Sequence, residues 1–265
     1  MWIRQPQYNA QPDRSNSIGK RLAFWSFGFN HHSHSLATRG LAGASEPTRG
    51  GQIGYNAAGA ASNSWAYDPA WGNHARTDGF SVFCEFYKFG NAASYARPFG
   101  RTAANGASPP YLNWTFALNP AGAGQDRCDA DISTTTAPFF LDTIAINNIV
   151  TGRNTVAMSI YPTGFTGYSQ GINRGSATVT PNNSVAGTDD VYIGSDGTSA
   201  QDTGSIVTCC LVILGALTDS EQRLLHNNPY YGFKTSERLL ANSAAASAFQ
   251  AAWARNRNQV IIDAS

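Results

Sequence analysis

Short apolar stretches separated by polar turns run along most of the chain, and their spacing predicts β-strands. β-branched and aromatic residues concentrate in each stretch, while Gly, Asn and Pro mark the loops between them. The predicted strands are Leu22–Phe29, Phe80–Phe89, Tyr111–Leu118, Phe139–Val150, Thr155–Tyr161, Ala177–Thr180, Val191–Ile193 and Ser205–Leu214. This pattern favours an all-β protein, and the absence of repeats argues against propellers and solenoids.

Two of these stretches are apolar on both faces. In the segment 80–89, Phe80, Val82, Cys84 and Phe86 alternate with a second set that contains Phe83 and is equally apolar apart from Glu85. The segment 205–214 is β-branched and almost continuously apolar. Strands of this kind are covered on both sides, so we expect a sandwich of two antiparallel sheets, a jelly roll.

A short helix should follow the last long strand. Thr218 can cap its first turn, and Glu221, three residues later, can accept a hydrogen bond from the Thr218 N–H. Asp219 stands near the positive end of the helix dipole. The sequence Asn227-Asn228-Pro229 should end the helix.

The two ends of the chain differ in character from the middle. Residues 1–18 are polar and without periodicity, which suggests an extended arm, and residues 19–233 form the predicted domain. The tail, 234–265, holds an Ala-rich segment and ends on a β-branched triplet. That triplet could add a strand to a neighbouring subunit or pair with the edge of its own sheet. We expect the assembly contacts at Trp2, Arg4, Phe249, Trp253, Val260, Ile261 and Ile262.

Three motifs carry a resemblance to a known family. They are Trp2-Ile3-Arg4-Gln5-Pro6-Gln7 at the start, Asp190-Val191-Tyr192-Ile193-Gly194 before the last strand, and the Leu217–Gln222 segment that begins the helix. Together they resemble laminin-G-like, concanavalin A-like jelly rolls of bacteriophage structural proteins. The resemblance implies this fold and a place in a virion, with other virion proteins and further copies of the chain as partners. It implies no chemistry, because the fold hosts lectins, glycosidases and inert shell proteins.

Composition and charge change this picture little. Charged residues make up 13% of the chain and the formal net charge is +1, which gives no electrostatic argument for nucleic acid or an anionic membrane. The N-terminus is polar from Gln5 to Lys20 and no apolar run approaches the roughly 20 residues of a membrane span. We therefore expect synthesis in the host cytoplasm. The cysteines of the predicted strands, Cys84, Cys209 and Cys210, should be reduced core residues, and Cys128 should lie in a polar loop.

The acidic residues give little reason to expect catalysis. Glycosidases on this fold place two carboxylates together on one strand face. The four glutamates, Glu46, Glu85, Glu221 and Glu237, are isolated in sequence. Only Glu85 stands on a strand from which it could point into a groove. No nucleophile elbow, phosphate-binding loop or zinc-protease motif is present either, so we expect a non-enzymatic protein.

Two further segments could bind ligands. Asp126, Asp129 and Asp131 are spaced as in a calcium loop, although Asp is also common in ordinary turns and Arg127 offsets part of the charge. No other cofactor is expected. The His31–His34 segment lacks a neighbouring carboxylate or cysteine, which favours a solvated loop. A sugar platform could form from Trp65, Tyr67, Asp68, Trp71 and Asn73.

These aromatic residues have a plainer interpretation as well, because large rings also anchor loops to a sandwich. Two functions therefore stay open at this stage. The main hypothesis is a structural virion protein, such as a decoration, collar or fibre-associated subunit. The alternative is a carbohydrate-binding module that attaches a particle to glycans on the host surface.

Overall fold

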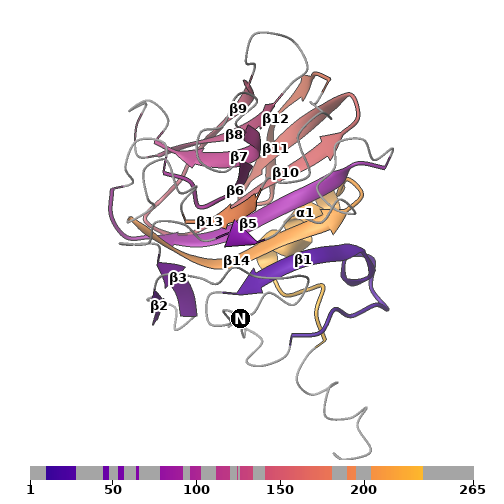
Figure 1. Ribbon diagram of the computed structural model, residues 1–265, viewed down its shortest axis with the longest axis horizontal. Coiled ribbons are helices and arrows are strands. Elements are labelled where there is room, and N and C mark those ends of the chain that lie inside the picture. The colour runs from indigo at the N-terminus through magenta and orange to yellow at the C-terminus, as the bar shows by residue number, and fades with distance from the viewer. Residues whose placement is uncertain are drawn as a thin grey trace, which may run out of the picture.

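The computed structural model describes residues 10–27, 44–47, 53–56, 64–65, 78–91, 96–102, 112–119, 124, 126–133, 141–180, 190–194 and 204–234. In these residues the chain forms two antiparallel sheets that pack face to face, with one short α-helix, as Figure 1 shows. The predicted all-β sandwich is confirmed. Among the same residues, no helix is long and apolar enough to cross a membrane.

The larger sheet has eight described strands. In spatial order they are β12 (Ile172–Thr178), β11 (Gly164–Ser169), β10 (Gly152–Tyr161), β5 (Phe80–Lys88), β14 (Ser205–Leu214), β3 (Ile53–Asn56) and β2 (Ala44–Pro47), and β1 (Leu22–Phe27) also pairs with β14. The smaller sheet has six, in the order β4 (Ser64–Trp65), β13 (Asp190–Ile193), β6 (Phe99–Thr102), β7 (Leu112–Leu118), β8 (Arg127–Ser133) and β9 (Leu141–Asn147).

The main hydrophobic core lies between the two sheets. On β5 the inward side chains are those of the first predicted face, Phe80, Val82, Cys84 and Phe86. They meet aromatic side chains of the six-stranded sheet, among which Phe99 and Trp114 make an edge-to-face contact with ring centroids 5.0 Å apart. Alternation along each strand therefore builds one continuous core.

A second apolar cluster covers the outer face of the eight-stranded sheet. Phe83 of β5 packs there with Leu211 of β14, Leu225 of helix α1 (Asp219–Asn227) and Phe27 of β1. The Phe27 ring also lies 5.1 Å from that of Phe233. The central strands are thus buried on both sides, as their apolar sequences predicted. Cys209 and Cys210, being adjacent, point into different clusters.

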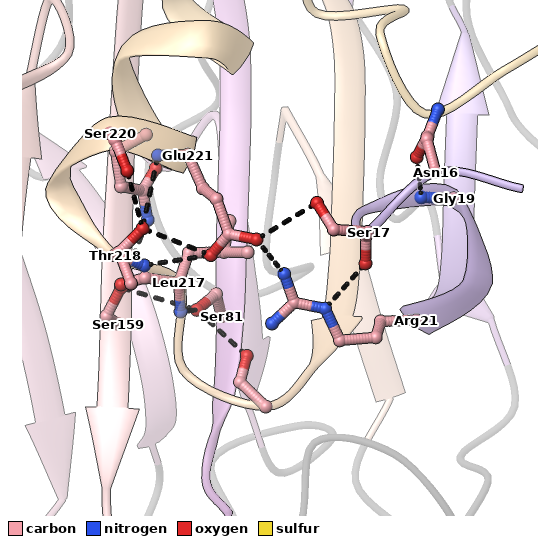
Figure 2. Close-up of polar contacts among 12 residues, drawn as sticks. Asn16, Ser17, Gly19, Arg21, Ser81, Ser159, Leu217, Thr218, Ser220 and Glu221 are labelled. Atoms are coloured by element: carbon pink, nitrogen blue, oxygen red, sulfur yellow. Dashed lines mark hydrogen bonds and ion pairs between the residues drawn. The ribbon is translucent and has the colours of Figure 1, made fainter.

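Helix α1 begins with the predicted capping box. The Glu221 N–H donates to Thr218 Oγ1 at 3.3 Å, and the Thr218 N–H donates to Glu221 Oε2 at 3.1 Å. Figure 2 shows that Glu221 also contacts Ser17 and Arg21 of the N-terminal segment. The cap thus joins the start of the helix to the start of the domain.

The residue before the cap is held by the sheet itself. The Leu217 N–H donates to Ser81 Oγ at 2.8 Å, and Ser159 Oγ donates to the Leu217 carbonyl at 2.9 Å. Gln222 Nε2 then donates to Ser159 Oγ at 3.1 Å. These buried hydroxyls fix the point at which the chain leaves β14 and turns into the helix.

We predict that Thr218→Ala lowers the free energy of unfolding by about 1 kcal/mol, because one helix N–H loses its acceptor. Thr218 is exposed, so the substitution leaves no cavity. Thr218→Ser, which retains the hydroxyl, is the matched control and should lie close to the wild type in urea unfolding. Equal stability of the Ala and Ser variants would show that the cap contributes nothing.

Residues 10–18 differ from the expected extended arm. The Asp13 N–H donates to the Gly232 carbonyl at 2.8 Å, the Lys234 N–H donates to the Gln11 carbonyl at 2.9 Å, and Ile18 is fully buried. Gly19 approaches so closely that a Cβ there would lie 2.2 Å from the Asp13 carbonyl oxygen. This part of the chain is consequently built into the domain, beside residues 230–234, whereas residues 1–9 lie outside the described part.

Candidate functional site

The segment 126–133, expected to be a polar loop, is mostly the strand β8. Cys128, Ala130 and Ile132 point into the core and are completely buried, while Asp129 and Asp131 lie on the opposite face. The expectation for Cys128 was wrong because alternating carboxylates gave the segment a loop-like composition. The signal that could have revealed the strand is the period of two in Cys-Asp-Ala-Asp-Ile.

Strand register places polar and small residues around these two aspartates, here called the carboxylate pair. Thr115 of β7 and Thr143 of β9 flank Asp131, and Ala117 and Ala145 flank Asp129. The pair therefore lies on the outer face of the six-stranded sheet. In the described part of the chain, the helix lies on the other sheet, beside β10 and β14 in Figure 1.

Each carboxylate has its own hydrogen-bond donors. Arg127 donates to both oxygens of Asp129, from Nε at 2.7 Å and from Nη2 at 3.1 Å, which is the bidentate geometry of a strong ion pair. Thr143 Oγ1 donates to Asp131 Oδ1 at 2.8 Å. The face thus presents one carboxylate held by a cation and a second held by a neutral hydroxyl.

Burial and neighbouring charge make Asp131 the most perturbed group of this face. Only 5% of the residue is exposed, and this desolvation raises the pKa of its carboxyl from 3.8 to about 6. The Thr143 hydrogen bond opposes the rise, Asp129 adds to it, and Arg97 and Arg127 reduce it. An ionised carboxylate kept in such a position costs stability, which is typical of functional sites.

The cross-strand neighbours of Asp131 continue beyond Thr115 to the strands β6 and β13. Gly100 of β6 lies between Thr115 and Tyr192 of β13. A Cβ on Gly100 would lie 2.4 Å from Thr115 Oγ1, so the close approach of these strands requires glycine. Exposure rises toward the edge strand β9, where Thr143, Ala145 and Asn147 are exposed. Among the described residues of this face, those of β9 are therefore the most accessible.

The predicted sugar platform begins in this sheet. Ser64 and Trp65 form β4, which pairs with β13 so that Ser64 is the partner of Tyr192. The backbone of Trp65 and the carboxylate pair therefore belong to the same sheet. Tyr67, Asp68, Trp71 and Asn73 lie outside the described residues, as do Trp2, Arg4, Phe249, Trp253, Val260, Ile261 and Ile262.

The calcium loop predicted from Asp126, Asp129 and Asp131 has no support in the described residues. Asp126 is exposed and precedes β8, where its carbonyl accepts from the Ile149 N–H at 2.8 Å. Asp129 is already paired with Arg127, and no three His, Cys, Asp or Glu side chains of the described residues come together as a metal site. The His31–His34 segment is outside those residues.

Glu85, the one glutamate expected to reach a groove, is instead enclosed beneath helix α1. Arg153 Nε donates to Glu85 Oε2 at 2.6 Å, and Thr208 Oγ1 donates to Glu85 Oε1 at 2.7 Å and to its carbonyl at 3.2 Å. Thr208 sits where the register of β14 shifts against β5, so the carboxylate holds a β-bulge in place. No part of Glu85 is exposed, which gives it a structural role.

Arg153, which pairs with Glu85, also fixes the last turn of helix α1. Arg153 Nη2 donates to the His226 carbonyl, which favours the negative end of the helix dipole, and Thr155 Oγ1 lies 2.9 Å from His226 Nδ1. Burial, together with the positive charge of Arg153, lowers the pKa of His226. Both ends of α1 are thus anchored to the eight-stranded sheet.

Comparison with solved structures shows a likeness of fold at low sequence identity. Domain 4 of AbnA, a GH43 extracellular arabinanase from Geobacillus stearothermophilus, matches at a TM-score of 0.53 with 15% identity, over 78% of this chain and 98% of that domain. A Trypanosoma rangeli sialidase matches at 0.55 with 14% identity, over 83% of this chain but only 36% of the sialidase. The likeness is one of fold. No family model and no curated protein matches the chain, and no comparison indicates a bacteriophage origin.

Proposed function

We propose that the domain binds a carbohydrate through the outer face of its six-stranded sheet, the alternative function that the sequence left open. The observation that carries this proposal is the carboxylate pair, which is only 5 to 6% exposed and lies on a sheet face that the described helix does not cover. The fold gives further support, because the arabinanase domain was solved with arabinotriose and the sialidase with 2,3-difluoro-KDN.

The chemistry of the face suits sugar hydroxyls, which both donate and accept hydrogen bonds. Asp131 offers acceptor capacity beyond the hydrogen bond that it accepts from Thr143, and the guanidinium of Arg127, with a side chain 34% exposed, offers donors. The exposed β9 residues provide hydroxyl, methyl and amide groups beside them. A few well-placed polar groups of this kind fix the orientation of a small ligand.

Binding is favoured over hydrolysis for a geometric reason. A carboxyl of raised pKa beside a second carboxyl group is also what acid catalysis at a glycosidic bond uses. However, both oxygens of Asp129 accept bonds from Arg127, which weakens that carboxylate as a nucleophile. Hydrolysis of a bound glycan should therefore be measured separately from binding, and we expect no hydrolysis.

The direct test is a glycan array probed with the full chain, followed by calorimetric titration of a positive glycan. Asp131→Asn should weaken binding at least tenfold, because a charged acceptor is lost. Asp126→Asn, which removes an exposed carboxylate just before the same strand, should bind as the wild type does. A chain that binds no glycan, or two variants that bind equally well, would refute the proposal.

Binding should also depend on pH in a defined direction. The ionised carboxylate of Asp131 offers two acceptor oxygens, and burial raises its pKa to about 6, so the dissociation constant should be constant above pH 7. One unit below the pKa, near pH 5, about a tenth of the carboxyl is ionised and the dissociation constant should be about tenfold higher. Titrations from pH 5 to 8 measure this, and a flat profile would exclude Asp131 as a ligand contact.

A further inference from the structure

Two cysteines face one another across the central strands of the eight-stranded sheet. Cys84 of β5 and Cys210 of β14 are register partners, and both side chains point into the core between the sheets. Their Sγ atoms lie 4.0 Å apart, and both thiols are free and fully buried. Nothing in the proposed glycan site involves them.

We propose that Cys84 and Cys210 form a cross-strand disulfide when the chain folds in the presence of a small disulfide oxidant such as glutathione disulfide. Directly opposed residues of antiparallel strands have Cα atoms about 4.5 to 5.5 Å apart, which lies within the range that a disulfide spans. The sulfurs must approach from 4.0 Å to the disulfide bond length of about 2.05 Å.

The alternative pairings are poorer. Cys209 is adjacent to Cys210 but points into the cluster on the other face of the sheet. Cys128 belongs to β8 of the opposing sheet, and packed sheets stand about 10 Å apart. Among the four cysteines of the chain, the contact between Cys84 and Cys210 therefore defines one expected bridge.

The reaction is two successive thiol–disulfide exchanges. One cysteine thiolate attacks glutathione disulfide, forms a mixed disulfide and expels one glutathione thiolate; the second cysteine then attacks the protein sulfur of the mixed disulfide and expels the other. Two cysteine protons end on the two glutathione thiols, and the two electrons reduce the oxidant. Burial raises the pKa of Cys210 and leaves neither thiol exposed, so the bridge should form before the sheets close.

The test is to refold the full chain from denaturant in glutathione disulfide and, in parallel, in reduced glutathione. After alkylation of the denatured product, intact mass should show two alkylated cysteines in the first sample and four in the second. Peptide mapping should link Cys84 to Cys210. Four alkylated cysteines after oxidative refolding, or a bridge that involves Cys128 or Cys209, would overturn the proposal.

Stability provides a second readout. A bridge that closes a loop of about 125 residues should lower the equilibrium constant of unfolding by about three to four orders of magnitude. Cys209→Ala retains the two proposed partners and should show this difference between oxidised and reduced protein, whereas Cys84→Ala should not. If Cys84→Ala fails to fold, the double variant Cys128→Ala/Cys209→Ala, which retains only the proposed pair, provides the test. The two thiols of this variant should disappear on oxidative refolding. An oxidised protein no more stable than the reduced one would contradict the proposed geometry.

Discussion

Asp131→Asn should raise the free energy of unfolding by about 2 to 3 kcal/mol at pH 8 and by little at pH 4. In the folded protein the pKa of Asp131 is about 6, compared with 3.8 for the unperturbed group. At pH 8 the carboxyl is ionised in both states, and the fold carries the cost of the buried charge. Each unit of pKa difference corresponds to about 1.4 kcal/mol.

The sign follows from proton binding. Between pH 6 and pH 3.8 the folded state binds a proton that the unfolded state has lost, so the wild type recovers stability as the pH falls through this window. The Asn amide oxygen can still accept from Thr143, but it carries no charge to desolvate. The gain of the variant over the wild type should therefore vanish as the pH approaches 4.

Urea unfolding at pH 4, 6 and 8 measures the effect. Asp126→Asn is the control, because Asp126 is exposed and its substitution should change stability by less than about 0.5 kcal/mol at each pH. An Asp131→Asn variant that is equally or less stable than the wild type at pH 8 would show that the buried charge of Asp131 does not destabilise the fold. A more stable variant that no longer binds glycan would show that this charge is retained for function at a cost in stability.

Glu85→Gln should lower the free energy of unfolding by about 2 to 4 kcal/mol. The substitution removes the charge that Arg153 pairs with, in a place where no part of Glu85 is exposed. Breaking a buried pair by removing one partner leaves the other charge uncompensated. Thr208 also loses its charged acceptor at the β14 bulge, and Arg153 loses the group that aims it at the end of helix α1.

A double-mutant cycle distinguishes this ion pair from general damage. Glu85→Gln combined with Arg153→Met should cost less than the sum of the two single variants, because neither charge is then left alone. Glu221→Gln, which alters a carboxylate in the first turn of the same helix, with a side chain 16% exposed, should cost about 1 kcal/mol or less. A Glu85→Gln variant with unchanged stability would contradict the role given to this cluster, whereas its glycan binding should be retained in either case.

Patterns formed by residues that are close together in the sequence gave the most reliable predictions of structure. The capping box of Thr218 and Glu221 is confirmed, because both partners lie within one turn of the helix. The double-sided burial of β5 and the full extent of β14 are confirmed as well, since their own side chains carry the pattern. In each case the residues that decide the structure are neighbours in sequence.

Contacts distant in sequence could not be predicted in this way. Residues 10–18 look like a polar arm, yet their partners stand more than 200 positions away, as in the bond from Asn16 Nδ2 to the Tyr231 carbonyl at 2.8 Å. Strands such as β3, β6 and β11 are short or rich in glycine, and pairing with neighbours rather than propensity makes them strands.

For the same reason, the sequence predicted only part of the candidate site. The sequence predicted Asp129 and Asp131 as calcium ligands in a loop, together with Asp126. Their position on β8, and the neighbours Thr115 and Thr143 from the adjoining strands, depend on the register of the sheet. Sequence alone could not show that burial would perturb one carboxyl and that Arg127 would hold the other.

The most direct test of the central claim is an NMR titration that maps where a glycan binds. With a glycan identified on the array, backbone amide shifts should change on β7, β8 and β9, with the largest changes around Thr115, Asp129, Asp131 and Thr143. The amides of helix α1 and of β14 should stay unchanged. Shift changes that cluster on the helix side of the eight-stranded sheet and spare β8 would contradict a carbohydrate site on the six-stranded sheet.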